Sequence, residues 1–115
     1  MDTMLYLQKL GMTRYQSSVL SNILAKQNST ALEISEITQV PYTKIYQVLD
    51  SLRYMGFVVA DLERPMRFRA VDIDAIVDKL VKSHQESLSR IKRVGEEVKA
   101  AYRPDMDEFH TEKAI

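Results

Sequence analysis

The pattern of apolar positions predicts a set of helices followed by two strands, and the helix from Tyr42 to Met55 is its clearest element. Its apolar residues recur at helical spacing along one stripe: Ile45, Val48, Leu49, Leu52 and Met55. Pro41 precedes the first turn, where its missing N–H costs no hydrogen bond, and Gly56 is placed to end the helix. We therefore predict an amphipathic helix with one face in a core and the other in solvent.

Shorter helices precede this one. Thr13 and Gln16 fit a capping box, in which each side chain satisfies a backbone N–H at the start of a helix. A further helix is predicted over 32–37, with Ile37 expected to face inward, and a turn follows at 38–41. Two helices joined by a short turn of this kind are typical of a helix-turn-helix.

Two strands are predicted after Gly56, at Phe57–Ala60 and Met66–Val71. Alternation along the second strand sends Phe68 to the core and its charged neighbours to the opposite face. Three arginines belong to this hairpin: Arg64, Arg67 and Arg69. Guanidinium groups clustered beside a helix-turn-helix suit phosphates or a narrow minor groove, so the hairpin reads as the wing of a winged helix-turn-helix. A solvated edge strand protected by charge is the alternative.

The outward face of the helix from Tyr42 to Met55 carries groups that can read DNA. Gln can pair with adenine, Thr can touch a base or the thymine methyl group, and Lys can reach phosphate or guanine. The candidate DNA-binding residues are Tyr42, Thr43, Lys44, Tyr46, Gln47, Arg64, Arg67 and Arg69. The alternative is that these are ordinary solvated residues of an amphipathic helix; their position between a turn and a basic wing favours recognition of double-stranded DNA.

Composition narrows the other possibilities. The chain has 16 basic and 16 acidic residues and a pI of about 6.7, so a nucleic-acid function must depend on where the charge lies. No cysteine is present, and the two histidines, His84 and His110, lack ligand-like spacing. We expect no metal, cofactor or small-molecule ligand, and no catalytic set of residues is recognisable. No apolar run is long enough for a membrane, so we expect a cytoplasmic protein that is not an enzyme.

A long helix is predicted from residue 72 to about residue 103, because this stretch holds no proline before Pro104 and only one glycine. It exceeds what a small winged-helix core can cover, so its apolar seam should pair with the same helix of a second subunit as a coiled coil. The expected dimerisation residues are Val77, Leu80, His84, Leu88, Ile91, Val94 and Val98. Packing against the opening helix of the same or the other chain is the competing arrangement.

Three regions follow from these elements. Residues 1–71 form the winged helix-turn-helix DNA-binding domain, residues 72–103 the long dimerisation helix, and residues 104–115 an acidic tail expected to be mobile. The fold class is mainly α with a small β-hairpin.

The residues also resemble a known family. Segments 10–15, 33–35, 40–52, 56–58 and 64–71 are similar, in order, to motifs of the TrmB family of archaeal transcription regulators. The resemblance implies a winged helix-turn-helix that binds DNA and regulates transcription. Tyr42 departs from the pattern, because this position is often basic in the family. The 115 residues end soon after the long helix, so we expect a short form lacking the C-terminal sugar-binding effector domain of larger members.

Together these observations predict a sequence-specific, double-stranded DNA-binding transcriptional regulator that acts as a homodimer. The alternative is a winged-helix protein-interaction module or scaffold subunit without sequence-specific DNA binding. Zero net charge and the tyrosines Tyr46 and Tyr54 favour that alternative, whereas the polar character of Thr43 and Gln47 favours DNA.

Overall fold

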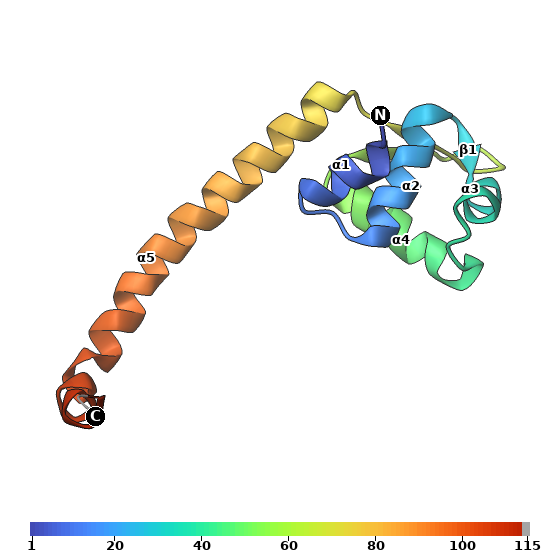
Figure 1. Cartoon of the computed structure of the whole chain (residues 1–115). Coiled ribbons are helices and arrows are strands. Elements are labelled where there is room, and N and C mark those ends of the chain that lie inside the picture. The colour runs from blue at the N-terminus through green and yellow to red at the C-terminus, as the bar shows by residue number, and fades with distance from the viewer. Residues whose placement is uncertain (114–115) are drawn as a thin grey trace. The chain divides into compact units, whose positions relative to one another are not determined.

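The computed structural model describes residues 1–113, with side chains described as far as residue 103. The chain is mainly helical, with one small sheet (Figure 1). In order, its elements are α1 (Thr3–Lys9), α2 (Arg14–Ala25), β1 (Ser29–Thr30), α3 (Ala31–Thr38), α4 (Tyr42–Tyr54), β2 (Val58–Asp61), β3 (Arg67–Ala70) and α5 (Ile73–Lys113). Residues 1–80 form one unit, and α5 beyond residue 80 belongs to a second.

The helices α2 and α3 both begin with capping boxes. At the start of α2, the Gln16 amide N–H donates to Thr13 Oγ1 at 3.1 Å, and Gln16 Oε1 accepts from the Thr13 amide at 3.0 Å. This confirms the expected cap. At the start of α3, Thr30 and Glu33 make the same reciprocal pair, at 3.2 and 2.9 Å. These bonds satisfy backbone N–H groups that have no partner inside the helix and so fix where each helix begins.

The turn between α3 and α4 is held by short side chains. The Ser35 hydroxyl donates to the buried carbonyl of Val40 at 2.6 Å, and the Thr38 hydroxyl donates to the Ile34 carbonyl at 2.6 Å. Gln39 adopts a left-handed conformation, with φ of 62°, which reverses the chain before Pro41. The structure therefore contains the predicted helix-turn-helix, with α4 as its second helix.

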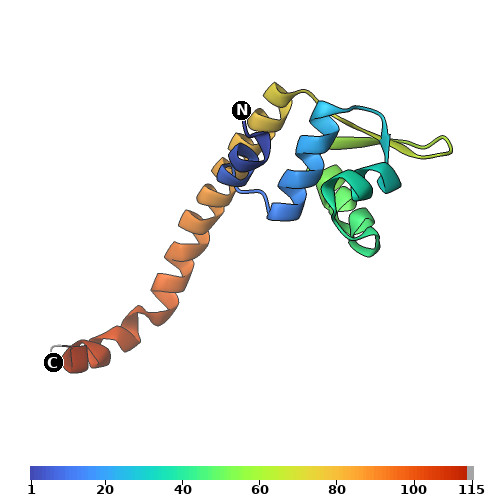
Figure 2. The same ribbon diagram turned by 45° about the vertical axis from the view of Figure 1, so that its right-hand side comes forward.

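The sheet has three antiparallel strands in the order β1-β3-β2. The hairpin pairs Val58 with Ala70 and Asp61 with Arg67, while β1 pairs Ser29 with Phe68 on the other edge of β3. Figure 2 shows the hairpin projecting past the helices, with β1 leading into α3 beside it. The wing was expected as a two-stranded hairpin, and the two-residue strand β1 adds a third partner that joins it to α3.

The apolar stripe along α4 lies in the core of residues 1–80, as predicted. Ile45, Leu49 and Leu52 of α4 are fully buried, and Phe68 of β3 closes the core from the sheet side. Ile37 is different: it was expected to face inward, but 57% of its surface is exposed. Ala31, Ile34 and Ser35 form the buried face of α3. Ile37 lies about a third of a turn away from that face, beyond the reach of the neighbouring helices.

Helix α5 begins at the expected place, because Asp72 Oδ1 accepts a hydrogen bond from the Ala75 amide at 2.9 Å. Ile76 is fully buried in the core of residues 1–80, and Leu80 packs partly against it. None of the helices that the structure describes is long and apolar enough to cross a membrane.

The end of α5 differs from the sequence-based expectation. We expected the helix to stop at 103, because a proline within a helix removes a hydrogen bond and crowds the preceding turn. The helix instead continues through Pro104 to Lys113, over the residues expected to form a mobile tail. No glycine follows Pro104, and the Met, Glu and Lys residues there favour helix. Residues 114 and 115 of the expected tail lie outside the described residues.

Candidate nucleic-acid interface

The outward face of α4 carries a set of open polar groups. Thr43, Lys44 and Gln47 are all exposed, and their side chains make no hydrogen bond or ion pair within the part of the chain that the structure describes. The opposite stripe of the same helix is buried, so this face cannot rotate inward. A hydroxyl, an ammonium and a carboxamide are thus available together for a ligand outside the chain.

Two tyrosines flank this polar set at the start of α4. The rings of Tyr42 and Tyr46 meet edge to face, with centroids 5.9 Å apart and an interplanar angle of 82°. The Tyr42 hydroxyl beside it, together with partial desolvation, raises the pKa of Tyr46 above its ordinary value. Tyr46 therefore remains neutral at physiological pH and can donate a hydrogen bond.

The side chain of Gln16 links α4 to α2. Its Oε1 atom serves the capping box, while its Nε2 donates to the Ser51 hydroxyl at 3.2 Å. Ser51 in turn donates to the Val48 carbonyl at 2.7 Å, one turn back along α4. One amide group thus connects the start of α2 to the middle of the helix that carries the open polar face. Sequence reasoning assigned Gln16 to the cap alone.

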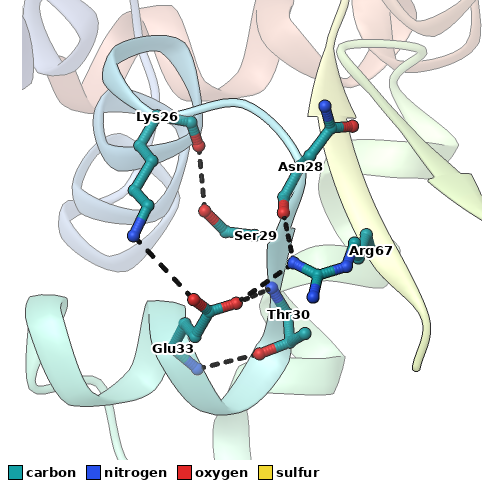
Figure 3. A network of polar contacts seen from close by, with 6 residues as sticks. All are labelled: Lys26, Asn28, Ser29, Thr30, Glu33 and Arg67. Atoms are coloured by element: carbon teal, nitrogen blue, oxygen red, sulfur yellow. Dashed lines mark hydrogen bonds and ion pairs between the residues drawn. The ribbon is translucent and has the colours of Figure 1, made fainter.

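The three wing arginines are not equivalent. All three are exposed, but Arg67 makes contacts within its own chain (Figure 3). Its Nη1 donates to the Asn28 carbonyl at 2.8 Å and lies 3.5 Å from Glu33 Oε1. No hydrogen bond or ion pair holds the side chains of Arg64 and Arg69 among the described residues. Arg67 therefore ties the wing to the start of α3, while the other two guanidinium groups stay open.

Glu33 is the centre of this contact network (Figure 3). Its carboxylate accepts from the Thr30 amide, and Lys26 Nζ approaches its other oxygen at 3.8 Å. Hydrogen bonds from Thr30 contribute most to lowering the pKa of Glu33, with smaller contributions from Lys26 and Arg67. The carboxylate is therefore ionised at neutral pH and keeps two cations near the junction of α3 and the wing.

The structure brings the predicted DNA-binding residues into two groups. Five of them lie along the first turns of α4, and the arginines lie on β3 and the loop before it. Sequence reasoning missed the residues that hold Arg67, namely Asn28 and Glu33. The Thr30-x-x-Glu33 spacing is a capping-box signal that could have located Glu33. No sequence signal marks Asn28, because it contributes a backbone carbonyl.

The expected dimerisation residues occupy α5. Val77, Leu88, Ile91, Val94 and Val98 are exposed, as is His84. Leu80 packs partly against the core of its own unit, so much of its side chain is already covered. Sequence reasoning left out the exposed Val81 and Tyr102. Their spacing from the other apolar residues follows a heptad and could have identified them.

Comparison with known proteins assigns the chain to a family. Residues 7–74 match the profile of the family described as sugar-specific transcriptional regulator TrmB. The chain is 29% identical over 92 residues to the HTH-type sugar sensing transcriptional regulator TrmBL1 of Pyrococcus furiosus. That match covers 80% of this chain but 27% of TrmBL1, so the chain spans about a quarter of that relative's length.

Solved structures show the same fold at lower identity. The archaeal chromatin protein TrmBL2 superimposes with a TM-score of 0.70 at 23% identity, over 89% of this chain and 41% of that one. Lactococcus lactis ZitR in complex with DNA gives 0.51 at 16% identity, over 91% and 75%. Both likenesses concern the fold. The family match spans more than half of the residues, and the chain belongs to the TrmB family of transcriptional regulators.

Proposed function

We propose that this chain is a sequence-specific, double-stranded DNA-binding transcriptional regulator that acts as a homodimer in the cytoplasm. The observation that carries the proposal is the open face of α4, where Thr43, Lys44 and Gln47 are exposed and have no partner among the described residues. A helix of this kind, presented by a helix-turn-helix, is suited to the major groove, where Gln and Thr can distinguish bases.

In this proposal the wing is the second DNA-binding element. Arg64 and Arg69 are available for phosphates, whose contacts set affinity and register without reading sequence. Arg67 contributes by holding the wing, because its guanidinium already bonds to Asn28 and lies beside Glu33. Tyr42 and Tyr46 stand at the start of α4, where their rings and hydroxyl groups can contact the sugar-phosphate backbone or base edges.

The homodimer rests on the exposed apolar residues of α5. Ile91, with 66% of its surface exposed, and Leu88, with 53%, lie on a helix far longer than the core of residues 1–80 can cover. Pairing with a second copy would remove this surface from water. A two-fold dimer would also make the operator a pseudo-palindrome.

Selection from a random pool of duplexes tests the proposal. The wild-type chain should enrich a two-fold related motif, and Gln47→Ala should enrich a weaker or broader one. Retention of DNA without enrichment would contradict sequence specificity while leaving DNA binding intact. Ser89→Ala, on α5 and outside the set of candidate DNA-binding residues, is a control that should enrich the wild-type motif.

A protein-interaction module is the second candidate, and one observation favours it. Tyr54, at the end of α4, exposes 93% of its surface, and the total charge of the chain is zero. Failure of the wild-type chain to retain any duplex at low salt, where phosphate contacts are strongest, would favour this candidate.

A further inference from the structure

The exposed stripe of α5 has a regular register. Val77, Val81, His84 and Leu88 are followed, at the same alternating steps of four and three, by Ile91, Gly95, Val98 and Tyr102. This spacing is an uninterrupted heptad, and it keeps one seam in place along a pair of supercoiled helices. The seam differs from the one expected from sequence at two of the expected positions. Leu80 packs against the core of residues 1–80 and Val81 takes its place, and the unbroken heptad puts Gly95 in the seam and Val94 beside it.

We propose that α5 pairs with the α5 of a second copy in antiparallel orientation, in one register centred between Ser89 and Arg90. This inference rests on the proposed homodimer and adds its orientation. Every seam residue then has a counterpart. Val77 faces the partner's Tyr102, Val81 faces the partner's Val98, His84 faces the partner's Gly95, and Leu88 faces the partner's Ile91.

Gly95 and His84, the two seam residues without an apolar side chain, favour the antiparallel orientation. Gly95 has no side chain, and the space that a Cβ would occupy there is open, beside the exposed side chains of Ile91 and Val98. His84 is the one ionisable residue in the middle of the seam, between apolar neighbours. In the antiparallel register each His84 lies over the partner's Gly95, so the imidazole fills the space that glycine leaves. In a parallel pair, Gly95 would face glycine and leave a void, and His84 would face histidine.

Charges beside the seam favour the same choice. In antiparallel pairing the flanking residue Asp78 lies beside the partner's Lys99, twice in the dimer by symmetry. Lys99 has its own weak surface contact with Glu96 at 3.2 Å, which is exposed and can exchange. In parallel pairing the flanking positions would bring together Ser87 with Lys92 and Val94 with Lys99, without any opposite charges.

The orientation has a consequence for DNA binding. The paired segment from Val77 to Tyr102 is about 38 Å long at 1.5 Å per residue. Each DNA-binding unit precedes its α5 in the chain, so the two units attach at opposite ends of this segment. A parallel pair would attach both units at the same end.

Cysteine cross-linking tests the register, because the wild-type chain has no cysteine to interfere. Val81→Cys and Val98→Cys are made separately and treated with a short bifunctional maleimide, alone and as a mixture. In the antiparallel register each cysteine lies about 26 Å from its own copy in the partner but next to the other variant's cysteine. The mixture should cross-link and the separate samples should not.

Each other result overturns the inference in a distinguishable way. Cross-linking within the separate samples would show a parallel pair, leaving the dimer of the proposed function intact. A wild-type dimer in sedimentation with no cross-link in any sample would place the interface elsewhere. A wild-type monomer at micromolar concentration would overturn the dimer itself together with its orientation.

Exchanging His84 and Gly95 tests the register independently, through the affinity of the dimer. Gly95→His alone places two imidazoles against each other and should weaken the dimer about ten-fold or more, because overpacking a seam is destabilising. Adding His84→Gly to the same chain restores one histidine and one glycine in each layer, and the dimer should recover. Failure of the double variant to recover, while its helix content by circular dichroism equals that of the wild type, would contradict the facing of His84 and Gly95.

Discussion

The exposed face of α4 and the wing both present polar side chains to solvent. They differ in whether those side chains already contact other residues of the chain. Thr43, Lys44 and Gln47 have no partner among the described residues, whereas Arg67 of the wing is held by Asn28 and Glu33. Exposure alone does not separate the two cases, because 45% of the Arg67 side chain is still open to solvent. A guanidinium that already has an anion nearby gains less from a phosphate than one that has none.

We propose a separate role for each part of the candidate interface. In this proposal the face of α4 reads bases and Arg64 and Arg69 bind phosphate, while Arg67, which contacts Asn28 and Glu33, holds the wing beside α3. Substitutions in each part test this assignment of roles.

Loss of base reading should give the largest effect. We expect Gln47→Ala and Thr43→Ala each to reduce discrimination between the preferred duplex and a random one by roughly 1–3 kcal/mol. Lys44→Ala is the matched control on the same helix, and it should lower affinity for both duplexes alike. Titrations of both duplexes at one salt concentration make the measurement. Equal weakening on the two duplexes for Gln47→Ala would remove this residue from base reading.

Removal of the phosphate-binding side chains should appear in the salt dependence. We expect Arg64→Ala combined with Arg69→Ala to flatten the slope of log K against log salt by roughly 0.9 for each phosphate group that is no longer neutralised. The free energy of unfolding should stay close to that of the wild type, because neither side chain makes a hydrogen bond or ion pair among the described residues. Binding titrations over a salt series provide the test, and an unchanged slope would exclude the two arginines from the interface.

Substitution of Arg67 should separate stability from binding. Arg67→Ala removes the hydrogen bond to the Asn28 carbonyl, and we expect a decrease of about 1 kcal/mol in the free energy of unfolding. The salt slope of DNA binding should change less than it does for Arg64→Ala. Urea unfolding and the same salt series measure both quantities. A normal stability, together with a slope as flat as that of Arg64→Ala, would place Arg67 on the DNA.

The smallest effect concerns Glu33 and pH. Its pKa is lowered in the folded chain, so its ionised form stabilises the fold above the ordinary pKa of a glutamate. This contribution is lost as the pH falls through the lowered pKa. Glu33→Gln keeps an acceptor for the Thr30 amide and removes only the charge. We expect the stability difference between wild type and Glu33→Gln to shrink on acidification, as measured by urea unfolding; a constant difference would contradict the role of the charge.

Sequence reasoning located α4 and the wing because both depend on local patterns. The stripe of Ile45, Leu49 and Leu52 has a helical period, and Phe68 alternates with arginines. The helix-turn-helix followed from the same patterns. The polar outward face of α4 and the arginines of the wing supplied the expectation that these elements bind DNA, and the family resemblance implied the same function.

The remaining features depend on contacts between distant segments. Strand β1 has two residues, too few for any periodicity, and it exists because β3 offers it an edge. Ile37 lies on the open side of α3, which only the positions of the neighbouring helices decide. Arg67 donates to the backbone carbonyl of Asn28, far away in sequence. Every residue has a backbone carbonyl, so the residue type at position 28 does not predict this contact.

The edge-to-face pair of Tyr42 and Tyr46 has a thermodynamic consequence for any ligand that covers the start of α4. Each ring restricts the rotation of the other, so little side-chain entropy remains to be lost on binding. The rings also present apolar surface, and burying it gives a negative change in heat capacity. Binding to phosphates releases counterions, so the contribution of the wing weakens as the salt concentration rises. The heat-capacity change from burying the two rings does not depend on counterion release, and we expect calorimetry to detect it at high salt as well.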